Sequence, residues 1–322
     1  MTRRMWSGFA VAMAALLVAG CNRSGRLVER DGKPLVVTTV TMVTDMVREV
    51  GGERVHVEGL MGAGVDPHTF KPRISDARLL EDAAAVFYCG LHLEGKMQES
   101  LERLSLRKPQ VWAVSSGVPP DRLLAPQEEY EGHHDPHLWG DPALWAETVG
   151  VVVEGLSRID PEGRSGFEAR GEAYRKKLLA LDEWARARVA EIPEGKRVLV
   201  TSHDAFFYFG RAYGFEVRGL QGVSTVSEAG FKDRAQLVKF IRERGIRTIF
   251  PESSVNPKAI AAVAEEAGVE ASAEHLFSDA MGTPGDVVER RGESYDRGTY
   301  IGMVKHNINT VVDGLKPGGG TP

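Results

Sequence analysis

Cysteine is nearly absent from this sequence. Only two cysteines stand among the 322 residues, so a disulfide-rich scaffold is excluded. The chain also lacks an apolar stretch of roughly 20 residues, the length that a bilayer-spanning helix needs. Its most apolar run, Phe9–Ala19, covers only about half that length, which is typical of a signal peptide.

No block of basic residues runs through the chain. The net charge is −5, from 40 Lys and Arg against 45 Asp and Glu. A mildly acidic chain without such a block does not favour nucleic acid or an anionic lipid surface as a partner. With 42% hydrophobic and 26% charged residues, the composition is that of a folded protein, and the length suggests about two domains.

Several common catalytic motifs are missing as well. The chain contains no GxSxG, HExxH, P-loop or GxGxxG pattern. A hydrolase with a nucleophile elbow, a zincin protease, a P-loop NTPase and a dinucleotide-binding enzyme are therefore not indicated. These absences favour a binding protein over an enzyme.

The N-terminus has the layout of an export signal. Two arginines precede the apolar run, which ends in small residues directly before Cys21. This order resembles a bacterial lipobox, so we predict a signal peptide over residues 1–20, a lipid on Cys21 and a flexible tether over residues 21–34. The alternative is an ordinary secretory signal with an incidental cysteine. Cys89 is expected to be a buried structural thiol, which an oxidising compartment tolerates because it has no partner.

Short β-branched runs alternate with helical stretches in the first half of the chain. Such alternation predicts a mostly parallel sheet covered by helices, and we assign residues 35–160 to an N-terminal α/β lobe. The expected strands are residues 35–40, 54–60, 85–88 and 111–114, and the expected helices are residues 41–50 and a segment from Ser75, its N-cap, to Ala84.

The second half repeats this plan without a visible sequence repeat. We assign residues 193–315 to a C-terminal α/β lobe and expect a disordered tail over residues 316–322. The expected strands are residues 197–201, 216–220, 248–250 and 269–271, and the expected helices are residues 204–213, 232–244, 257–267 and 299–315.

One long helical pattern lies between the two halves. Apolar residues recur at helical spacing from Phe167 to Ile192, and they predict a helix over about residues 162–191. We therefore expect two Rossmann-like lobes joined by one rigid connecting helix over residues 161–192. The alternative is a pair of helices with a kink near Gly171.

Three of the nine histidines lie in similar short loops. His68 and His137 each follow Asp-Pro, and His203 follows a predicted strand. Proline restricts its own φ and the residue before it, so these loops orient an imidazole at little entropic cost. Asp279 follows the last strand predicted for the second half. Three imidazoles and one carboxylate near strand ends would suit a divalent first-row metal, although scattered structural histidines are the alternative.

The remaining histidines show no such pattern. His133 and His134 end the acidic stretch QEEYEGHH, which either collects cations or is an ordinary solvated loop. Structural roles are expected for the other four, which are His56, His92, His275 and His306.

Taken together, these segments resemble a known family, the TroA-like periplasmic zinc- and manganese-binding receptors of bacterial ABC importers. The matching segments run in family order over about residues 35–315. They are DPHTFKPRISDARLLEDAAAVFYCGLHLEGKM, HHDPHLWGDPALW, TSHDAFFYFGRAYGFEVRGLQGVSTVSEAG, FPESSVNPK, LFSDAMG and GTYIGMVKHNINTVVDGL. The resemblance implies a single metal in the cleft between the lobes, with His68, His137, His203 and Asp279 as its ligands.

The resemblance also implies a function. It predicts an extracytoplasmic receptor, held on a bacterial membrane as a monomeric lipoprotein, that delivers Zn²⁺ or Mn²⁺ as cargo to an ABC permease and its ATPase. Four protein ligands leave no open position for catalysis, so an enzyme is not expected. An adhesin with this fold and a metallohydrolase remain the alternatives, and the choice between zinc and manganese stays open.

Two departures from the family pattern stand out. Members devoted to zinc often carry a long His- and acid-rich insertion before DPHLW, whereas only QEEYEGHH is present here. Cys89 precedes Gly90 where asparagine is more usual. Neither departure touches the four expected ligands.

Overall fold

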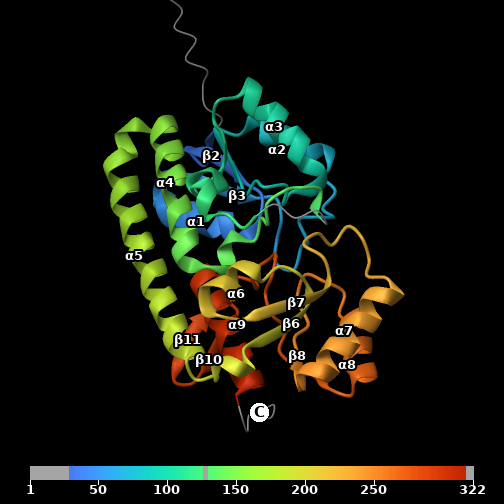
Figure 1. Ribbon diagram of the computed structural model, residues 1–322. Helices are drawn as coiled ribbons and strands as arrows, with labels where there is room; N and C mark the ends of the chain where they lie inside the picture. Colours follow the sequence, from blue (N-terminus) through green and yellow to red (C-terminus); the bar gives the residue numbers. More distant parts are fainter. Residues whose placement is uncertain (1–28, 126–129, 317–322) are drawn as a thin grey trace, which may run out of the picture.

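A computed structural model describes residues 29–125 and 130–316. The signal peptide, Cys21, most of the expected tether and the tail from residue 317 lie outside the described residues. Figure 1 shows two α/β lobes stacked one above the other, with one long helix running along the side of both.

The first lobe is built on a parallel sheet. Its strands lie in the order β3-β2-β4-β5, and β2 and β4 are almost wholly buried because helices cover the sheet. The strands are β2 (Lys33–Thr38), β3 (His56–Gly59), β4 (Ala85–Tyr88) and β5 (Val111–Ala113). The helices of this lobe are α1 (Thr41–Gly51), α2 (Ile74–Asp82), α3 (Gln98–Arg107) and α4 (Pro142–Ile159).

The second lobe repeats this strand order. Its parallel strands follow the order β7-β6-β8-β9, in which a bridge between Thr201 and Phe250 joins β6 to the β8 pair. The strands are β6 (Val198–His203), β7 (Glu216–Gln221), β8 (Thr248–Ile249) and β9 (Glu270–Ala271). The helices are α6 (Phe207–Tyr213), α7 (Phe231–Arg244), α8 (Lys258–Ala267) and α9 (Tyr300–Leu315), with a hairpin of β10 (Val287–Arg290) and β11 (Glu293–Asp296) before α9.

The connecting helix α5 (Arg164–Val189) is continuous over 26 residues, about 39 Å at 1.5 Å per residue. The alternative of a kink near Gly171 is therefore wrong. A Cβ on Gly171 would lie 2.5 Å from a methyl group of Val153, so this glycine allows α4 and α5 to approach closely. The buried face of α5 joins one apolar core that extends from Val36 in the first lobe to Val311 in α9.

The structure differs from the sequence prediction at the start of the first lobe. Residues 29–34, which were assigned to the tether, form a hairpin in which β1 (Glu29–Arg30) pairs antiparallel with the start of β2. The turn is Asp31-Gly32, with φ of 56° and 71°, so it has the left-handed backbone of a two-residue Asp-Gly hairpin.

A second difference concerns helices. Helix α2 begins at Ile74, with Arg73 at the N-cap, because the Asp76 carboxylate accepts the Arg73 backbone N–H at 2.7 Å. Ser75 is therefore not the cap, and Ala84 lies beyond the helix end. Helices α3 and α4 and the β10–β11 hairpin were not predicted.

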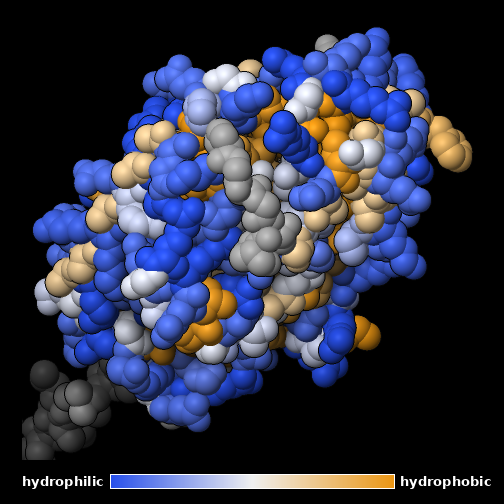
Figure 2. Space-filling model, turned by 90° about the horizontal axis from the view of Figure 1, so that it is seen from below, coloured by the Kyte–Doolittle hydropathy of each residue, from blue (hydrophilic) through white to orange (hydrophobic). Residues whose placement is uncertain are grey.

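The surface at the end of the second lobe is largely hydrophilic, with only small apolar patches (Figure 2). Within residues 29–125 and 130–316, every helix is too short or too polar to cross a bilayer.

Candidate metal centre

Four side chains meet between the lobes, and they are the four that the sequence singled out. One donor atom from each of His68, His137, His203 and Asp279 lies within 4.8 Å of the others, and each residue is at most 1% exposed. The Nε2 atoms of His68 and His137 are 3.4 Å apart. Each Asp279 oxygen lies 3.3 Å from one imidazole Nε2, Oδ1 from that of His137 and Oδ2 from that of His203.

Each lobe supplies two of these side chains. His68 lies in the loop after β3, and His137 lies in the segment that precedes α4. His203 is the last residue of β6, and Asp279 lies in the loop after β9. The site therefore forms where the carboxyl ends of parallel strands from both sheets face each other, as expected for open α/β sheets.

Two carboxylates behind the site fix the orientation of two imidazoles. Asp135 Oδ1 accepts the backbone N–H of His137 and lies 2.8 Å from its Nδ1. Glu252 does the same for His203, with Oε1 on the backbone N–H and Oε2 at 2.5 Å from Nδ1. Because a carboxylate only accepts, each Nδ1 must carry a proton, so Nε2 is the nitrogen that would bind a ligand once its own proton is displaced.

Asp279 is placed by the core behind it. Ser254 Oγ lies 3.5 Å from Oδ2 of Asp279 and 2.8 Å from the hydroxyl of Ser278. The indole N–H of Trp139 donates to the Ser278 carbonyl at 2.7 Å, and the Tyr300 hydroxyl donates to the Trp139 carbonyl at 2.7 Å. These bonds hold the Asp279 loop of the second lobe against the His137 segment of the first.

The carboxylates favour positive charge at the centre of the site. Burial lowers the pKa of His137, but Asp135 and Asp279 outweigh it and raise that pKa to about 9. Burial likewise lowers the pKa of His203, yet Glu252 and Asp279 raise it well above its usual value. Burial takes the pKa of His68 down to about 3. Although burial acts to raise the pKa of Asp279, His203 and His137 hold it well below the usual range.

Within the described residues, two atoms of this donor set make no hydrogen bond, namely His203 Nε2 and Asp279 Oδ1, and both are fully buried. Each has only an oppositely charged atom at 3.3 Å. A buried polar atom without a well-formed hydrogen bond costs about 1–3 kcal/mol, and a bound metal ion would offset that cost. Three imidazole nitrogens and a carboxylate oxygen, all converging on one point, are a donor set that could hold a zinc or manganese ion.

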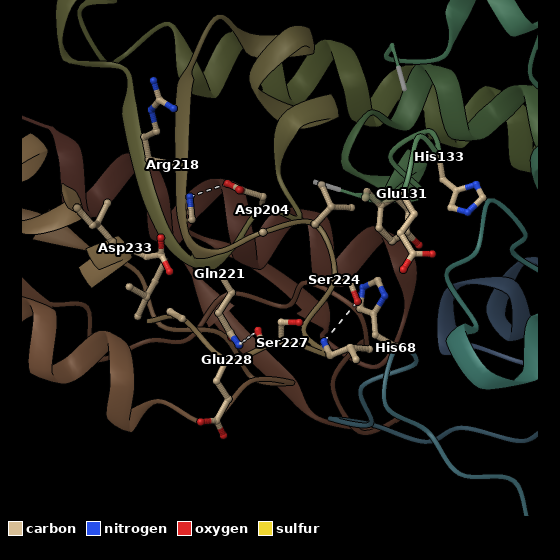
Figure 3. Close-up of a pocket in the computed structure, with 18 of the residues that line it drawn as sticks. His68, Glu131, His133, Asp204, Arg218, Gln221, Ser224, Ser227, Glu228 and Asp233 are labelled. Atoms are coloured by element: carbon tan, nitrogen blue, oxygen red, sulfur yellow. Dashed lines mark hydrogen bonds between the residues drawn. The ribbon is translucent and has the colours of Figure 1, made fainter. Parts of the chain in front are cut away.

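A cleft of about 790 Å³ lies beside this centre (Figure 3). His68 lines it, together with Glu131 and His133 from the first lobe and residues 218–224 and 226–229 from the second. His133 stacks on His92 with ring centroids 3.5 Å apart. His134 is turned away from the cleft lining, with Nδ1 at 2.5 Å from the Leu124 carbonyl oxygen.

The sequence analysis did not predict that Asp135 and Glu252 orient the imidazoles of His137 and His203. Asp135 was visible as the acid of the second Asp-Pro-His motif, but its bond to the ring depends on the fold of the loop. Glu252 comes two residues after the end of the predicted strand 248–250, just as His203 comes two residues after the predicted strand 197–201. An acidic residue at the end of a neighbouring strand was the signal that could have found it.

Two α/β lobes joined by a long helix, with an enclosed site of three histidines and one aspartate between them, define the class of metal-binding solute receptors. Comparisons with known proteins agree with this class. Residues 36–314 match the family described as zinc-uptake complex component A, periplasmic. The chain therefore belongs to this family, the TroA-like metal-binding receptors.

Individual relatives cover nearly the whole chain. The manganese-binding lipoprotein MntA of Bacillus subtilis is 39% identical over 95% of this chain and 98% of its own length. The zinc-binding protein TroA of Treponema pallidum is 43% identical over 88% of this chain and 90% of its own length. A solved structure of the Treponema protein superposes with a TM-score of 0.82 and covers 89% of this chain and 100% of that chain.

Proposed function

We propose that this protein is an extracytoplasmic receptor that binds a divalent transition metal, zinc or manganese, and delivers it to an ABC permease and its ATPase. The metal is cargo and is held by His68, His137, His203 and Asp279. The observation that carries the proposal is the convergence of these four buried donors within 4.8 Å. The printed names of the MntA and TroA relatives support the two candidate metals.

A carrier role suits the site better than catalysis. Catalytic zinc normally keeps one coordination position open for water or substrate, whereas four protein ligands complete a tetrahedral shell. Each lobe contributes two of the four donors, so separation of the lobes or movement of one loop would break the shell and free the metal. Membership in a family of uptake components supports the same conclusion.

The attachment to the membrane belongs to this proposal as well. Residues 1–20 would act as a signal peptide and Cys21 would carry the lipid anchor of a monomeric lipoprotein. The lipoprotein designation of the Bacillus relative supports this assignment. A Cys21→Ser variant should be unprocessed or released from the membrane, and recovery of a processed variant in the membrane fraction would count against it.

His133 is the better placed of the two histidines proposed to collect cations. It lines the cleft beside Glu131, while His134 is engaged by a backbone carbonyl. We propose that His133 attracts cations to the cleft mouth. The His133→Ala variant should slow zinc association without changing the number of ions bound.

Zinc binding to purified protein tests the proposed function. Wild-type protein should bind one Zn²⁺ per chain, and zinc at 1,000-fold excess over Kd should stabilise the fold by about 4 kcal/mol. The His203→Ala variant should lose most of this stabilisation. His275→Ala removes an exposed imidazole outside the site and serves as the control. An unchanged zinc-induced shift in His203→Ala would contradict the assignment of His203.

A further inference from the structure

His68 differs from the other three candidate ligands in its position relative to solvent. It is the one of the four that lines the cleft, whereas the other three lie deeper. If the protein functions as proposed, a metal ion that leaves through this cleft must pass His68. The loop that holds His68 therefore controls how easily the shell opens.

The two Asp-Pro-His loops use their aspartates differently. In the second loop, Asp135 contacts both the backbone N–H and the ring of His137. In the first loop, Asp66 Oδ1 accepts the backbone N–H of His68 at 2.9 Å, but within the described residues no carboxylate contacts the His68 ring. The orientation of His68 thus depends on its backbone and on Asp66.

The second oxygen of Asp66 contacts the other lobe. Oδ2 accepts the Thr225 hydroxyl of the other lobe at 2.6 Å and the Thr69 hydroxyl of its own loop at 2.9 Å. We propose that Thr225 is a positioning residue that latches the His68 loop to the second lobe and slows the release of bound metal. The latch rests on the proposed function, because it acts on the same site.

Thr225 is presented by a loop that is already ordered by its own hydrogen bonds. The side-chain amide of Gln221 donates to the Ser227 carbonyl at 3.1 Å, and the Val226 N–H donates to the Ser224 hydroxyl at 3.3 Å. Figure 3 shows His68 beside Ser224 of this loop. Since the loop is held in shape, the Thr225 bond restrains the motion of the His68 loop relative to the second lobe.

The size of the effect follows from the type of bond. A hydroxyl that donates to a carboxylate makes a charge-assisted hydrogen bond, and Asp66 and Thr225 are both half-buried. Loss of one such bond should accelerate metal release about tenfold. The association rate should change much less, because the bond forms only after the His68 loop has closed against the second lobe.

The experiment compares the Thr225→Val and Thr69→Val variants. Zinc-loaded proteins are mixed with excess chelator, and the release rate is followed. Thr225→Val should release zinc about tenfold faster than wild type, and Thr225→Ser should restore the wild-type rate. Thr69→Val removes a bond to the same Asp66 oxygen within one loop, so it should have a clearly smaller effect. If both valine variants release zinc equally faster than wild type, the latch is overturned. The two hydroxyls would then act only by holding the Asp66 side chain in place.

A metal-free measurement completes the test. Hydrogen exchange at the His68 amide should be faster in metal-free Thr225→Val than in metal-free wild type and Thr69→Val. If wild-type protein binds zinc and Thr225→Val releases it at the wild-type rate, the latch is overturned and the proposed function stands. If wild-type protein binds neither zinc nor manganese, the proposed function fails and the latch is overturned with it.

Discussion

Glu252 holds His203 through two contacts at once, with one carboxylate oxygen on the backbone N–H at 2.9 Å and the other at 2.5 Å from Nδ1. Both residues are at most 1% exposed. The imidazole is therefore fixed in plane and in tautomer, with Nε2 directed at the other candidate ligands. A ligand fixed in this way loses little rotational freedom when a metal binds.

The Glu252→Gln variant should bind zinc 10–100-fold more weakly than wild type, because an amide cannot supply the negative charge behind the ring. Calorimetric titration with Zn²⁺ checks this. Glu243→Gln, on the exposed face of α7, is the matched control and should bind as wild type does. Wild-type affinity in Glu252→Gln would show that the charge behind His203 is unimportant.

The Asp45→Asn variant should be more stable than wild type at pH 8. Burial raises the pKa of Asp45 to about 6, although the Tyr174 hydroxyl donates to it at 3.0 Å. The folded state therefore holds this proton more tightly than the unfolded state does. As pH rises from about 4 through 6, ionisation of Asp45 costs stability, by about 3 kcal/mol in total.

The measurement is urea unfolding of both proteins at pH 4 and pH 8. The advantage of Asp45→Asn should be near zero at pH 4 and close to its full value at pH 8. Asp82→Asn, at the exposed end of α2, is the surface control. An advantage that is equal at the two pH values would contradict the raised pKa.

Alanine should act in opposite directions at two helical glycines. At Gly171 in α5, the new Cβ would lie 2.5 Å from Val153, and such overpacking costs about 1–3 kcal/mol. At Gly150 in α4, a Cβ meets no atom within 4 Å, so alanine should stabilise the helix by about 0.5–1 kcal/mol. Thermal unfolding distinguishes them, and a more stable Gly171→Ala would show that the helices can separate at no cost.

Metal loading should leave the relative placement of the lobes nearly unchanged. The α5 helix is anchored to the first lobe by Arg170, which donates to the Val50 carbonyl at 2.7 Å. It is anchored to the second lobe by Arg188, which donates to Asn309 at 3.1 Å. Because a continuous helix offers no hinge residues, the ligand loops should move instead. Solution scattering should give equal radii of gyration with and without zinc, and a large decrease on loading would contradict a rigid α5.

The candidate site could be predicted from the sequence to the extent that local motifs define it. The Asp-Pro-His loops and the strand before His203 are short-range patterns, and each predicts an oriented histidine in a loop or just past a strand. The contact between Glu252 and His203 could not be predicted in the same way. It joins residues 49 positions apart and depends on β6 and β8 lying side by side.

The fold was predictable where hydrophobic periodicity is clear, as in α5 and α9. Helix α4 was missed because its Gly150-Val-Val-Val sequence has the β-branched character of a strand. The signal that was present is the Asp141 N-cap followed by Pro142. The β10–β11 hairpin was missed because its turn has Arg291, at φ 56°, where Asn or Asp is usual.

An X-ray crystal structure of the zinc-loaded protein, with anomalous diffraction at the zinc edge, tests the central claim most directly. We predict one strong anomalous peak. It should lie about 2.0–2.1 Å from the Nε2 atoms of His68, His137 and His203, and about 2.0–2.2 Å from an Asp279 oxygen. A zinc ion bound elsewhere, or one that lacks any of these four residues in its shell, would contradict it.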